Sequence, residues 1–419
     1  MPVSGIRSLL IEEMIQTNAA PRILTVSPNA FLTAIAMTGL VFVPLLTAKG
    51  VLLFLVAGGL IIVRQPGLIV PEAVRYWWIL AVPIFCLVTT VWSDHAGLTL
   101  RASLQLGVTF GIALAIANRV RSQDFYWAIW LPFGLAMLAS ILIGSVRSDG
   151  IWVGVFGSKN SFAASASTFT LMAVALILAR DVRGPTRLFG FAAAVLGAFL
   201  LVKAQSAGTL ALTVIACLTI PAFLMLRAMT PLARGALLLF GALILLLGTF
   251  MIFGFREELS AGILDATGKD TTLTGRTDLW QIALRLMGER PLGTGYAAFW
   301  VAGNSEAEMI WDMFLVKSRS GFNFHNTYLS NAVEIGVLGV ALQVVVFGSA
   351  LALSIRRAFV EASAAGIFAA IFMIELFLQS FIEVVMFSQF STRSVIIIVL
   401  AAQGVTALTR QRQSAETVS

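Results

Sequence analysis

Residues 326–353 read NTYLSNAVEIGVLGVALQVVVFGSALAL, and Glu334 is the only charged residue among them. A run of this length and composition is typical of a helix that crosses a bilayer, which needs about 20 apolar residues. Similar runs recur along the 419 residues, of which 58% are hydrophobic and only 12% charged. A soluble or disordered chain would carry far more charge, and an outer-membrane barrel would show short alternating segments. We therefore predict an all-α, polytopic bundle of transmembrane helices.

The apolar runs predict about twelve spans. They lie at 30–48, 50–64, 77–92, 98–117, 125–144, 161–179, 187–203, 206–226, 235–254, 326–353, 362–381 and 393–409. We expect the short second span to be tilted or partly re-entrant. Pro44, Pro83 and Pro132 fall inside predicted spans, and membrane helices tolerate proline better than soluble helices do.

The distribution of Lys and Arg predicts the orientation of the bundle. With the N-terminus in the cytoplasm, fifteen of the 28 basic residues lie on the inner side and six on the outer side, while seven lie in 255–325. Such long loops do not obey the positive-inside rule. We expect a bacterial inner-membrane protein with both termini in the cytoplasm. The predicted parts are a cytoplasmic tail (1–28), nine spans (29–254), a periplasmic loop (255–325), three spans (326–409) and a second cytoplasmic tail (410–419).

The segment 255–325 interrupts the series of spans, and loops of this length are usually functional or disordered. Residues 277–288 predict an amphipathic helix. Its apolar face consists of Leu279, Ile282, Ala283 and Leu286. Ser305 and Glu308 have the spacing of a capping box and predict the start of a second helix. We expect both helices to lie on the membrane surface with their apolar faces down.

Several chemistries are not supported by the sequence. The stretch PLGTGYAAFW (291–300) contains GTG, but no strand–helix frame surrounds it, so dinucleotide binding is not indicated. Cys86 and Cys217 lie inside apolar runs, which is typical of free buried thiols. No CxxC, HExxH or DxD cluster is present, so we expect neither a metal nor another cofactor. The net charge of +7 is attributed to cytoplasmic loops rather than to nucleic-acid binding.

His325 and Asn326 lie where the long segment enters the tenth predicted span, at the boundary between water and bilayer. A histidine takes up a proton near neutral pH, so His325 is a candidate general base. Arginine forks match phosphate oxygens. Cations predicted on the outer side are Arg276, Arg285, Arg290, Arg319 and Lys159. Among these, we interpret Arg285 and Arg290 as surface charges rather than ligands.

Six ordered motifs carry a family resemblance. They are VWSDHAGLTLR (91–101), GVFGSKNSFA (154–163), LTGRTDLW (273–280), PLGTGYAAFW (291–300), HNTYLSNAVEIGVLG (325–339) and QSFIEVVMF (379–387). Together they resemble the O-antigen ligase and Wzy-type polysaccharide polymerase superfamily, and within it the exopolysaccharide polymerases of the succinoglycan type. The resemblance implies a GT-C-like membrane fold.

The resemblance also implies a reaction. A glycan passes from an undecaprenyl-diphosphate carrier to an acceptor sugar hydroxyl, with inversion at the anomeric carbon and without metal or nucleotide. By this resemblance, His325 takes the place of the loop histidine of the family, and Arg276 that of a loop arginine that binds the diphosphate. Lys203 lies one helical turn before Ala207, where exopolysaccharide relatives often carry a basic residue.

Further residues complete the expected site. Lys159, Arg101 and Lys203 are candidates for donor binding, and Asn326, Glu334 and Glu383 are candidates for supporting roles. Simpler interpretations stay open: His325 as an interfacial residue, Arg276 as a helix cap or headgroup contact, Lys159 as a helix start and Arg101 as a snorkelling side chain. For His95 we favour a solvated or structural role. Glu375 is expected to be the structural partner of a buried cation.

Three functions fit this sequence to different degrees. The favoured one is polymerisation of lipid-linked repeat units, with the lipid bilayer, an acceptor glycan, a flippase and chain-length or export proteins as expected partners. The alternatives within the superfamily are a ligase acting on lipid A-core and, less favoured, a protein oligosaccharyltransferase. A transporter or flippase is a distant alternative, since no clear internal repeat is visible.

Overall fold

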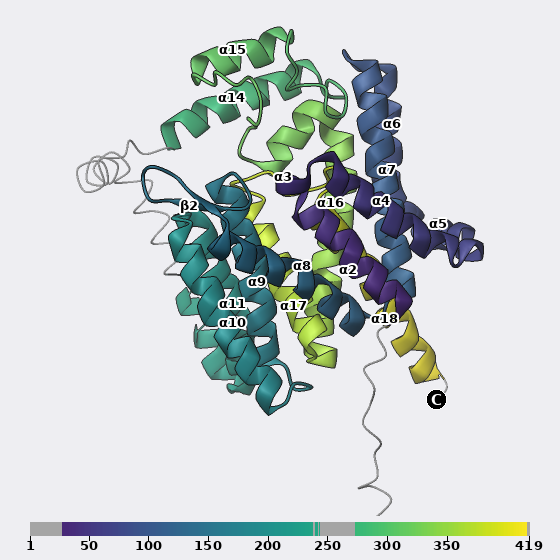
Figure 1. The fold of residues 1–419 in the computed structure, drawn as a ribbon, viewed down its shortest axis with the longest axis vertical. Coiled ribbons are helices and arrows are strands. Elements are labelled where there is room, and N and C mark those ends of the chain that lie inside the picture. The colour runs from purple at the N-terminus through teal and green to yellow at the C-terminus, as the bar shows by residue number, and fades with distance from the viewer. Residues whose placement is uncertain (1–26, 238, 242, 244–272, 417–419) are drawn as a thin grey trace, which may run out of the picture.

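The computed structural model describes residues 27–416 except 238, 242 and 244–272, and most of this part of the chain is helical (Figure 1). The prediction of an all-α protein is confirmed. The helices are α2 (Pro28–Val41), α3 (Val43–Leu46), α4 (Ala48–Val63), α5 (Ile69–Arg75), α6 (Trp77–Val88), α7 (Ala96–Arg119), α8 (Ser122–Leu142), α9 (Lys159–Leu178), α10 (Gly184–Lys203), α11 (Ala207–Ala228), α14 (Leu273–Glu289), α15 (Ser305–Met313), α16 (Thr327–Glu361), α17 (Ala364–Gln379) and α18 (Thr392–Glu416). Short 3₁₀ helices, η1 (Pro66–Leu68) and η2 (Thr89–Val91), precede α5 and follow α6. The sequence did not indicate the one small hairpin, β1 (Ser145–Val146) with β2 (Trp152–Gly154).

Six of the described helices are long and apolar enough to cross a membrane, namely α7, α8, α9, α10, α16 and α18. The helix α4 makes a seventh if it forms one broken span with the η1–α5 segment, from which it is bent by 87°. This bend fits the expected tilt or re-entrance of the second span. Shorter apolar helices, α2, α6, α11 and α17, occupy the places of other predicted spans. Most of the ninth predicted span, 235–254, lies outside the described residues. The protein is therefore a multi-pass membrane protein.

The first predicted span was placed too long. It ends at Val41, and the chain turns through α3 before α4 begins at Ala48. Pro44 lies in this turn and not inside a span, because proline suits the first turn of a new helix. The returning helix packs tightly on α2. A Cβ added to Gly39 would lie only 2.5 Å from the carbonyl oxygen of Gly50, so this crossing requires glycine.

The helix α17 forms the centre of the bundle and packs against α16, α11, α9 and α8. Thirteen of its sixteen residues are buried, among them Ile367, Phe368 and Ile371. A helix that is apolar on all sides and almost fully buried is what an interior position in a membrane bundle requires. The site described below is built on the chain that leaves this central helix.

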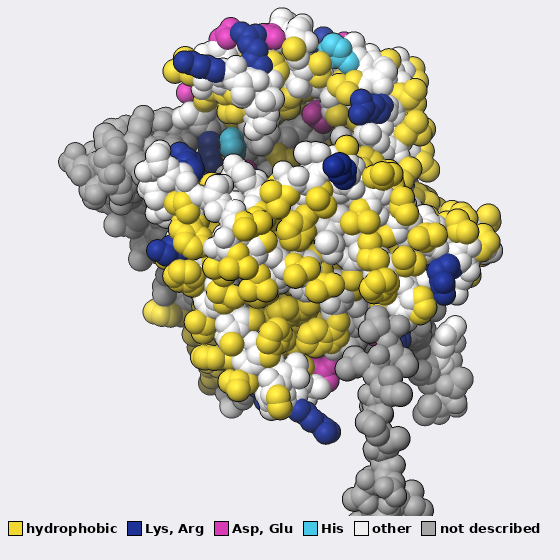
Figure 2. All heavy atoms as spheres, in the orientation of Figure 1, with side chains coloured by type: hydrophobic (Ala, Val, Ile, Leu, Met, Phe, Trp, Pro, Cys, Tyr) yellow, Lys and Arg dark blue, Asp and Glu magenta, His cyan; other side chains and the backbone are white. Residues whose placement is uncertain are grey.

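The bundle has two chemically different ends. At the C-terminal end, hydrogen bonds join the loops that carry predicted cytoplasmic arginines, namely Arg119 with Gln65, Arg75 with Thr409 and Arg180 with Ala362. At the opposite end, α14 and α15 with their connecting loops (residues 273–325) form a cap over the bundle (Figure 1). Figure 2 shows hydrophobic side chains across the middle of the molecule and charged ones mostly above and below. The loops predicted to be cytoplasmic and the segment predicted to be periplasmic thus lie at opposite ends of the bundle.

The cap contains both predicted helices, but their apolar faces are not turned to a membrane surface. Leu279, Ala283 and Leu286 of α14 are buried in one cluster with Trp311 of α15 and Phe324. Packing the two faces on each other removes their apolar area from water. The predicted capping box is also displaced by one residue. Asn304 rather than Ser305 caps α15, since its Oδ1 accepts a hydrogen bond from the N–H of Glu306.

Candidate active site

His325 lies at the junction of the cap and the bundle, directly before α16. Its φ of +48° is in the left-handed region, which costs a non-glycine residue conformational energy. The N–H of His325 donates to Asn323 Oδ1 at 2.7 Å, which stabilises this backbone conformation. Asn326 then caps α16 by accepting the N–H groups of Tyr328 and Leu329. The FNFHNT sequence therefore forms a tight helix start that fixes the position of the imidazole.

The imidazole of His325 faces the carboxylate of Glu383. Nδ1 of His325 lies 3.4 Å from Oε2 of Glu383, and the two side chains are 29% and 27% exposed. A carboxylate beside an imidazole orients the ring and compensates for the charge that forms when the ring takes up a proton. The structure thus brings together two residues that the sequence suggested for the site.

Thr327 holds the segment around Glu383 against the start of α16. Its hydroxyl donates to the carbonyl of Glu383 at 2.6 Å and accepts the N–H of Val385 at 3.1 Å. Its own N–H donates to the carbonyl of Ser380 at 2.9 Å, and Asn326 Nδ2 donates to the carbonyl of Phe381 at 3.1 Å. The backbone of the QSFIEVVMF motif is therefore hydrogen-bonded to the HNT motif. The two motifs are far apart in the sequence, since Glu383 follows His325 by 58 residues.

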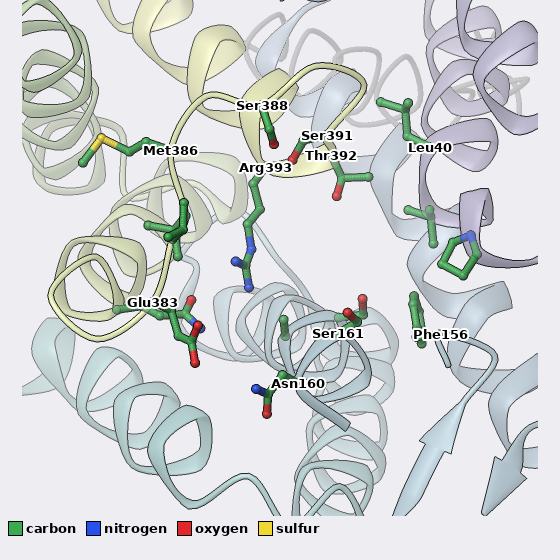
Figure 3. A pocket seen from close by; sticks show the side chains of 17 residues that line it. Leu40, Phe156, Asn160, Ser161, Glu383, Met386, Ser388, Ser391, Thr392 and Arg393 are labelled. Carbon is green, nitrogen blue, oxygen red and sulfur yellow. The ribbon is translucent and has the colours of Figure 1, made fainter. Parts of the chain in front are cut away.

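A cavity of about 370 Å³ opens beside Glu383 (Figure 3). Its walls come from α2 and α3, from the start of α9 and from residues 379–393. Figure 3 shows the guanidinium of Arg393 pointing into this space, toward Glu383 on one side and Asn160 on the other. Within the described part of the chain, Arg393 has no hydrogen-bond partner and no carboxylate within ion-pair distance, but it interacts electrostatically with Glu375 and Glu383.

Arg393 is the site residue that the sequence interpretation missed. It was counted only as one outer cation among six at the short loops and helix ends. The available signal was a single arginine at the first turn of a long apolar span, where a charge is costly and usually functional. Only the folded chain shows that it faces the same cavity as Glu383.

Arg276 lies in the first turn of α14 and is half-buried. One turn later on the same helix face, the indole N–H of Trp280 donates to the carbonyl of Phe324 at 2.9 Å. The helix that carries Arg276 is therefore attached to the residue next to His325. Among residues that the structure describes, none forms an ion pair or hydrogen bond with Arg276. Figure 2 shows a histidine and basic side chains together in the hollow between α14 and β2.

The other arginines of the cap are paired with carboxylates. Arg285 binds Glu306 at 2.8 Å and Glu289 at 3.1 Å, and these hydrogen bonds raise its pKa. Arg290 pairs with Asp94. Arg319 pairs with Asp312 at 3.1 Å and also with Glu308. These contacts agree with the interpretation of Arg285 and Arg290 as surface charges.

The three remaining donor-site candidates lie in different places. Lys159 is the half-buried first residue of α9, next to the cavity residue Asn160. Arg101 is exposed in the second turn of α7. Lys203 is exposed at the end of α10, with its ammonium 5.6 Å from the centre of the Phe199 ring. Of the three, only Lys159 is next to the cavity, and no described contact connects Arg101 or Lys203 to His325.

Comparisons with known proteins identify two sequence matches. Residues 191–344 match the Wzy_C family model, described as O-Antigen ligase. Over 295 residues the chain is 34% identical to the exopolysaccharide production protein ExoQ of Rhizobium meliloti (strain 1021). That alignment covers 67% of this chain and 66% of ExoQ, just under two thirds of the relative. The chain belongs to the O-antigen ligase and polysaccharide polymerase superfamily. The family match contains Arg276 and His325 and ends before Glu383 and Arg393.

In this superfamily member, the glycine-rich PLGTGYAAFW stretch is a scaffold. The helix α16 is broken at Gly336, whose φ is +69°, and the loop lies in the break. A Cβ on Gly336 would lie 2.4 Å from the carbonyl oxygen of Pro291, and one on Gly293 would lie 2.4 Å from that of Glu334. Gly336 therefore admits the loop into the break of the helix. The carboxylate of Glu334 accepts the N–H of Ala297 at 3.0 Å and so holds this loop.

The WSDH stretch continues the same scaffold on the other side of the loop. The indole of Trp92 donates to the carbonyl of Leu292 at 3.2 Å, and the N–H of Asp94 donates to Thr294. His95 precedes α7, where its N–H donates to the hydroxyl of Ser93. The solvated or structural role favoured for His95 fits this position.

Glu375, expected to be the structural partner of a buried cation, makes its direct contacts with hydroxyl groups among the described residues. Its Oε1 accepts hydrogen bonds from the hydroxyls of Ser167 and of Thr213, the latter at 3.1 Å. The nearest cation, Arg393, lies beyond ion-pair distance but interacts with it electrostatically. Hydroxyl donors satisfy a buried carboxylate without a second buried charge, and this explains these contacts.

Proposed function

We propose that the protein is a bacterial inner-membrane glycosyltransferase that polymerises glycan from an undecaprenyl-diphosphate-linked donor on the periplasmic face. The observation that carries this proposal is the His325–Glu383 pair, which lies beside a cavity that Arg393 also lines, at the cap end. Superfamily membership and the similarity to an exopolysaccharide production protein support the same reaction class. The basic loops at the C-terminal end support a cytoplasmic position for that end and a periplasmic position for the cap.

The reaction that fits these residues is a single displacement. The imidazole of His325 takes the proton of the acceptor hydroxyl while that oxygen attacks the anomeric carbon of the donor sugar. The bond between this carbon and the diphosphate oxygen breaks, and undecaprenyl diphosphate leaves with the electron pair. Attack opposite the leaving group inverts the anomeric configuration. Glu383 compensates for the imidazolium charge, and Arg276 stabilises the negative charge of the diphosphate.

In this proposal the basic side chains replace a metal ion. A guanidinium group stays protonated and binds two phosphate oxygens at once, so it neutralises a leaving diphosphate without a metal. Positioning of donor and acceptor by the cap supplies the remaining rate acceleration. Removal of divalent cations with a chelator is therefore expected to leave the reaction rate unchanged.

Polymerase and ligase share this chemistry and differ in the acceptor. The longer alignment is with an exopolysaccharide production protein, whereas the O-antigen ligase model matches only residues 191–344. We therefore favour a growing glycan over lipid A-core as the acceptor.

Deletion of the gene followed by analysis of cell glycans tests this function. Loss of a polymerase leaves single repeat units, whereas loss of a ligase leaves carrier-linked polymer and bare core. A purified protein that moves solute across vesicles without forming a glycosidic bond would contradict both. Restoration of long chains by the wild-type gene, but not by the His325→Ala gene, is the expected result.

A further inference from the structure

Arg393 differs from the other buried arginines of this structure. Arg119, whose side chain is 0% exposed, donates to the carbonyl of Gln65 and pairs with Glu72 at 3.3 Å. Arg357, with a side chain 6% exposed, pairs with Glu361 at 3.0 Å. Arg393 is half-buried at the start of α18 and has no carboxylate within ion-pair distance among the described residues; Glu375 and Glu383 act on its charge only from farther away. Its guanidinium points into the cavity without a direct partner, so it is available to bind an anion there.

The opposite wall of the cavity also favours an anion. Asn160 and Ser161 line it from the first turn of α9, a helix of 20 residues. The first N–H groups of a helix carry the positive end of its dipole. One of them, the N–H of Ser161, already donates to the hydroxyl oxygen of Ser158, so the attraction here comes from the dipole as a whole. Lys159 adds a charged side chain at the same helix start. Arg393 and this helix start therefore attract negative charge from two sides of one cavity.

The third wall is apolar and comes from Leu40, Val41 and Pro44 of the α2–α3 turn. Beyond it, Leu45 and Leu46 of α3 are 50% and 37% exposed on the outside of the bundle. A cavity that has a guanidinium inside, a carboxylate on one side and an apolar exit fits a molecule that joins a phosphate group and a sugar to a hydrocarbon chain. A free anion without a hydrocarbon chain would gain no binding energy from the apolar wall.

On these grounds, and resting on the proposed function, we propose that Arg393 binds the diphosphate of the polyprenyl carrier in this cavity. The polyprenyl chain leaves between α3 and the start of α9. The donor sugar then extends toward Glu383, which borders the cavity on one side and contacts His325 on the other.

This arrangement also gives Glu383 a second effect. In the resting site its carboxylate repels the diphosphate that Arg393 attracts. When His325 takes the acceptor proton, the imidazolium and the carboxylate form a neutral pair, and this repulsion decreases. The decrease occurs as the diphosphate gains charge on leaving, so proton uptake and departure of the leaving group assist each other.

The test is a binding measurement on the purified full-length protein in lipid nanodiscs, with undecaprenyl diphosphate as the probe. Arg393→Gln is expected to raise the Kd at least about tenfold, since a hydrogen bond to a charged group contributes about 1.5–3 kcal/mol. Arg393→Lys is expected to lose less. Arg183→Gln is the matched control, because Arg183 is an exposed arginine at the other end of the bundle, and its Kd should equal that of the wild type.

Two further measurements complete the test. Ala164 is half-buried on the α9 side of the cavity, so Ala164→Phe places a ring in the cavity and should also weaken binding of undecaprenyl diphosphate. This variant tests whether the cavity is the binding site if Arg393→Gln does not fold. Inorganic pyrophosphate and undecaprenol should each bind more weakly than undecaprenyl diphosphate. Equal binding by pyrophosphate would contradict the lipid assignment.

The proposal is overturned if folded Arg393→Gln binds undecaprenyl diphosphate within twofold of the wild type. This readout needs neither an acceptor nor a glycosidic bond, so it is independent of the proposed function. An unchanged Kd together with normal chain synthesis would remove the role of Arg393 alone. Binding that depends on Arg393 in a protein that makes no glycosidic bond would remove the proposed function alone.

Discussion

Nδ1 of His325 lies 3.4 Å from Oε2 of Glu383, although the two residues are 58 positions apart in the sequence. His325 directly precedes α16, and Glu383 follows the end of α17. Thr327 makes this contact possible, because it binds the backbone at Ser380, Glu383 and Val385 at once. The imidazole therefore has a fixed carboxylate partner, and the predictions below follow from this arrangement.

Replacement of His325 by alanine should reduce the rate of glycosyl transfer by at least about 100-fold, the lower range for loss of a general base. The side chain is 29% exposed, so folding and membrane insertion should not change. The rate is measured with purified protein and a lipid-linked repeat unit. A variant that retains half of the wild-type rate would show that His325 is only an interfacial residue.

Glu383→Gln keeps the shape of the side chain but removes its charge. We expect kcat to fall by at least about tenfold, because the imidazolium then loses a charge-assisted partner. Glu289→Gln provides the control, since Glu289 is 55% exposed in the cap and pairs only with Arg285. Equal kcat values for the two variants would contradict the role of Glu383.

Arg276→Ala should raise KM for the lipid-linked donor by at least about tenfold, as expected for one lost hydrogen bond to a charged group. Arg285→Ala lies on the same helix and removes only exposed ion pairs, which contribute little. Its KM should match that of the wild type. If both variants behaved alike, Arg276 would be a surface charge like Arg285.

The break in α16 gives a prediction about stability. Gly336→Ala should destabilise the protein by more than the about 1–3 kcal/mol of a strained backbone residue. The reason is that its Cβ would also lie 2.4 Å from the carbonyl oxygen of Pro291. Gly348→Ala in the same helix meets nothing within 4 Å and should be neutral or slightly stabilising. Thermal unfolding in detergent compares the two, and similar melting temperatures would contradict this account of the break.

Much of the fold followed from local patterns. The length of apolar runs predicted the membrane helices, and the 3.6-residue period of 277–288 identified the buried face of α14. The partner of that face did not follow, because periodicity does not distinguish a lipid surface from a second helix. Asn304 and Ser305 both suit a helix cap, and only the backbone geometry selects Asn304.

The candidate site was less accessible from the sequence. His325 and Arg276 were found through motifs in the loop, and Glu383 through its place near the end of a span. That Glu383 contacts His325 depends on how α16 and α17 pack, which no local pattern contains. In the sequence Arg393 is not distinguishable from the other arginines at helix ends, and only the fold shows that it lines the cavity.

Accessibility of the cap from outside the cell tests the central claim most directly. Leu315 is 82% exposed in the cap, and the side chain of Arg121 is 82% exposed at the opposite end. After replacement of Cys86 and Cys217 by alanine, a single cysteine at position 315 should react with a membrane-impermeant maleimide in cells with an opened outer membrane. A cysteine at position 121 should react only after the inner membrane is broken. Labelling of position 121 but not position 315 in intact inner membranes would place His325 in the cytoplasm, away from the proposed donor, and contradict the account.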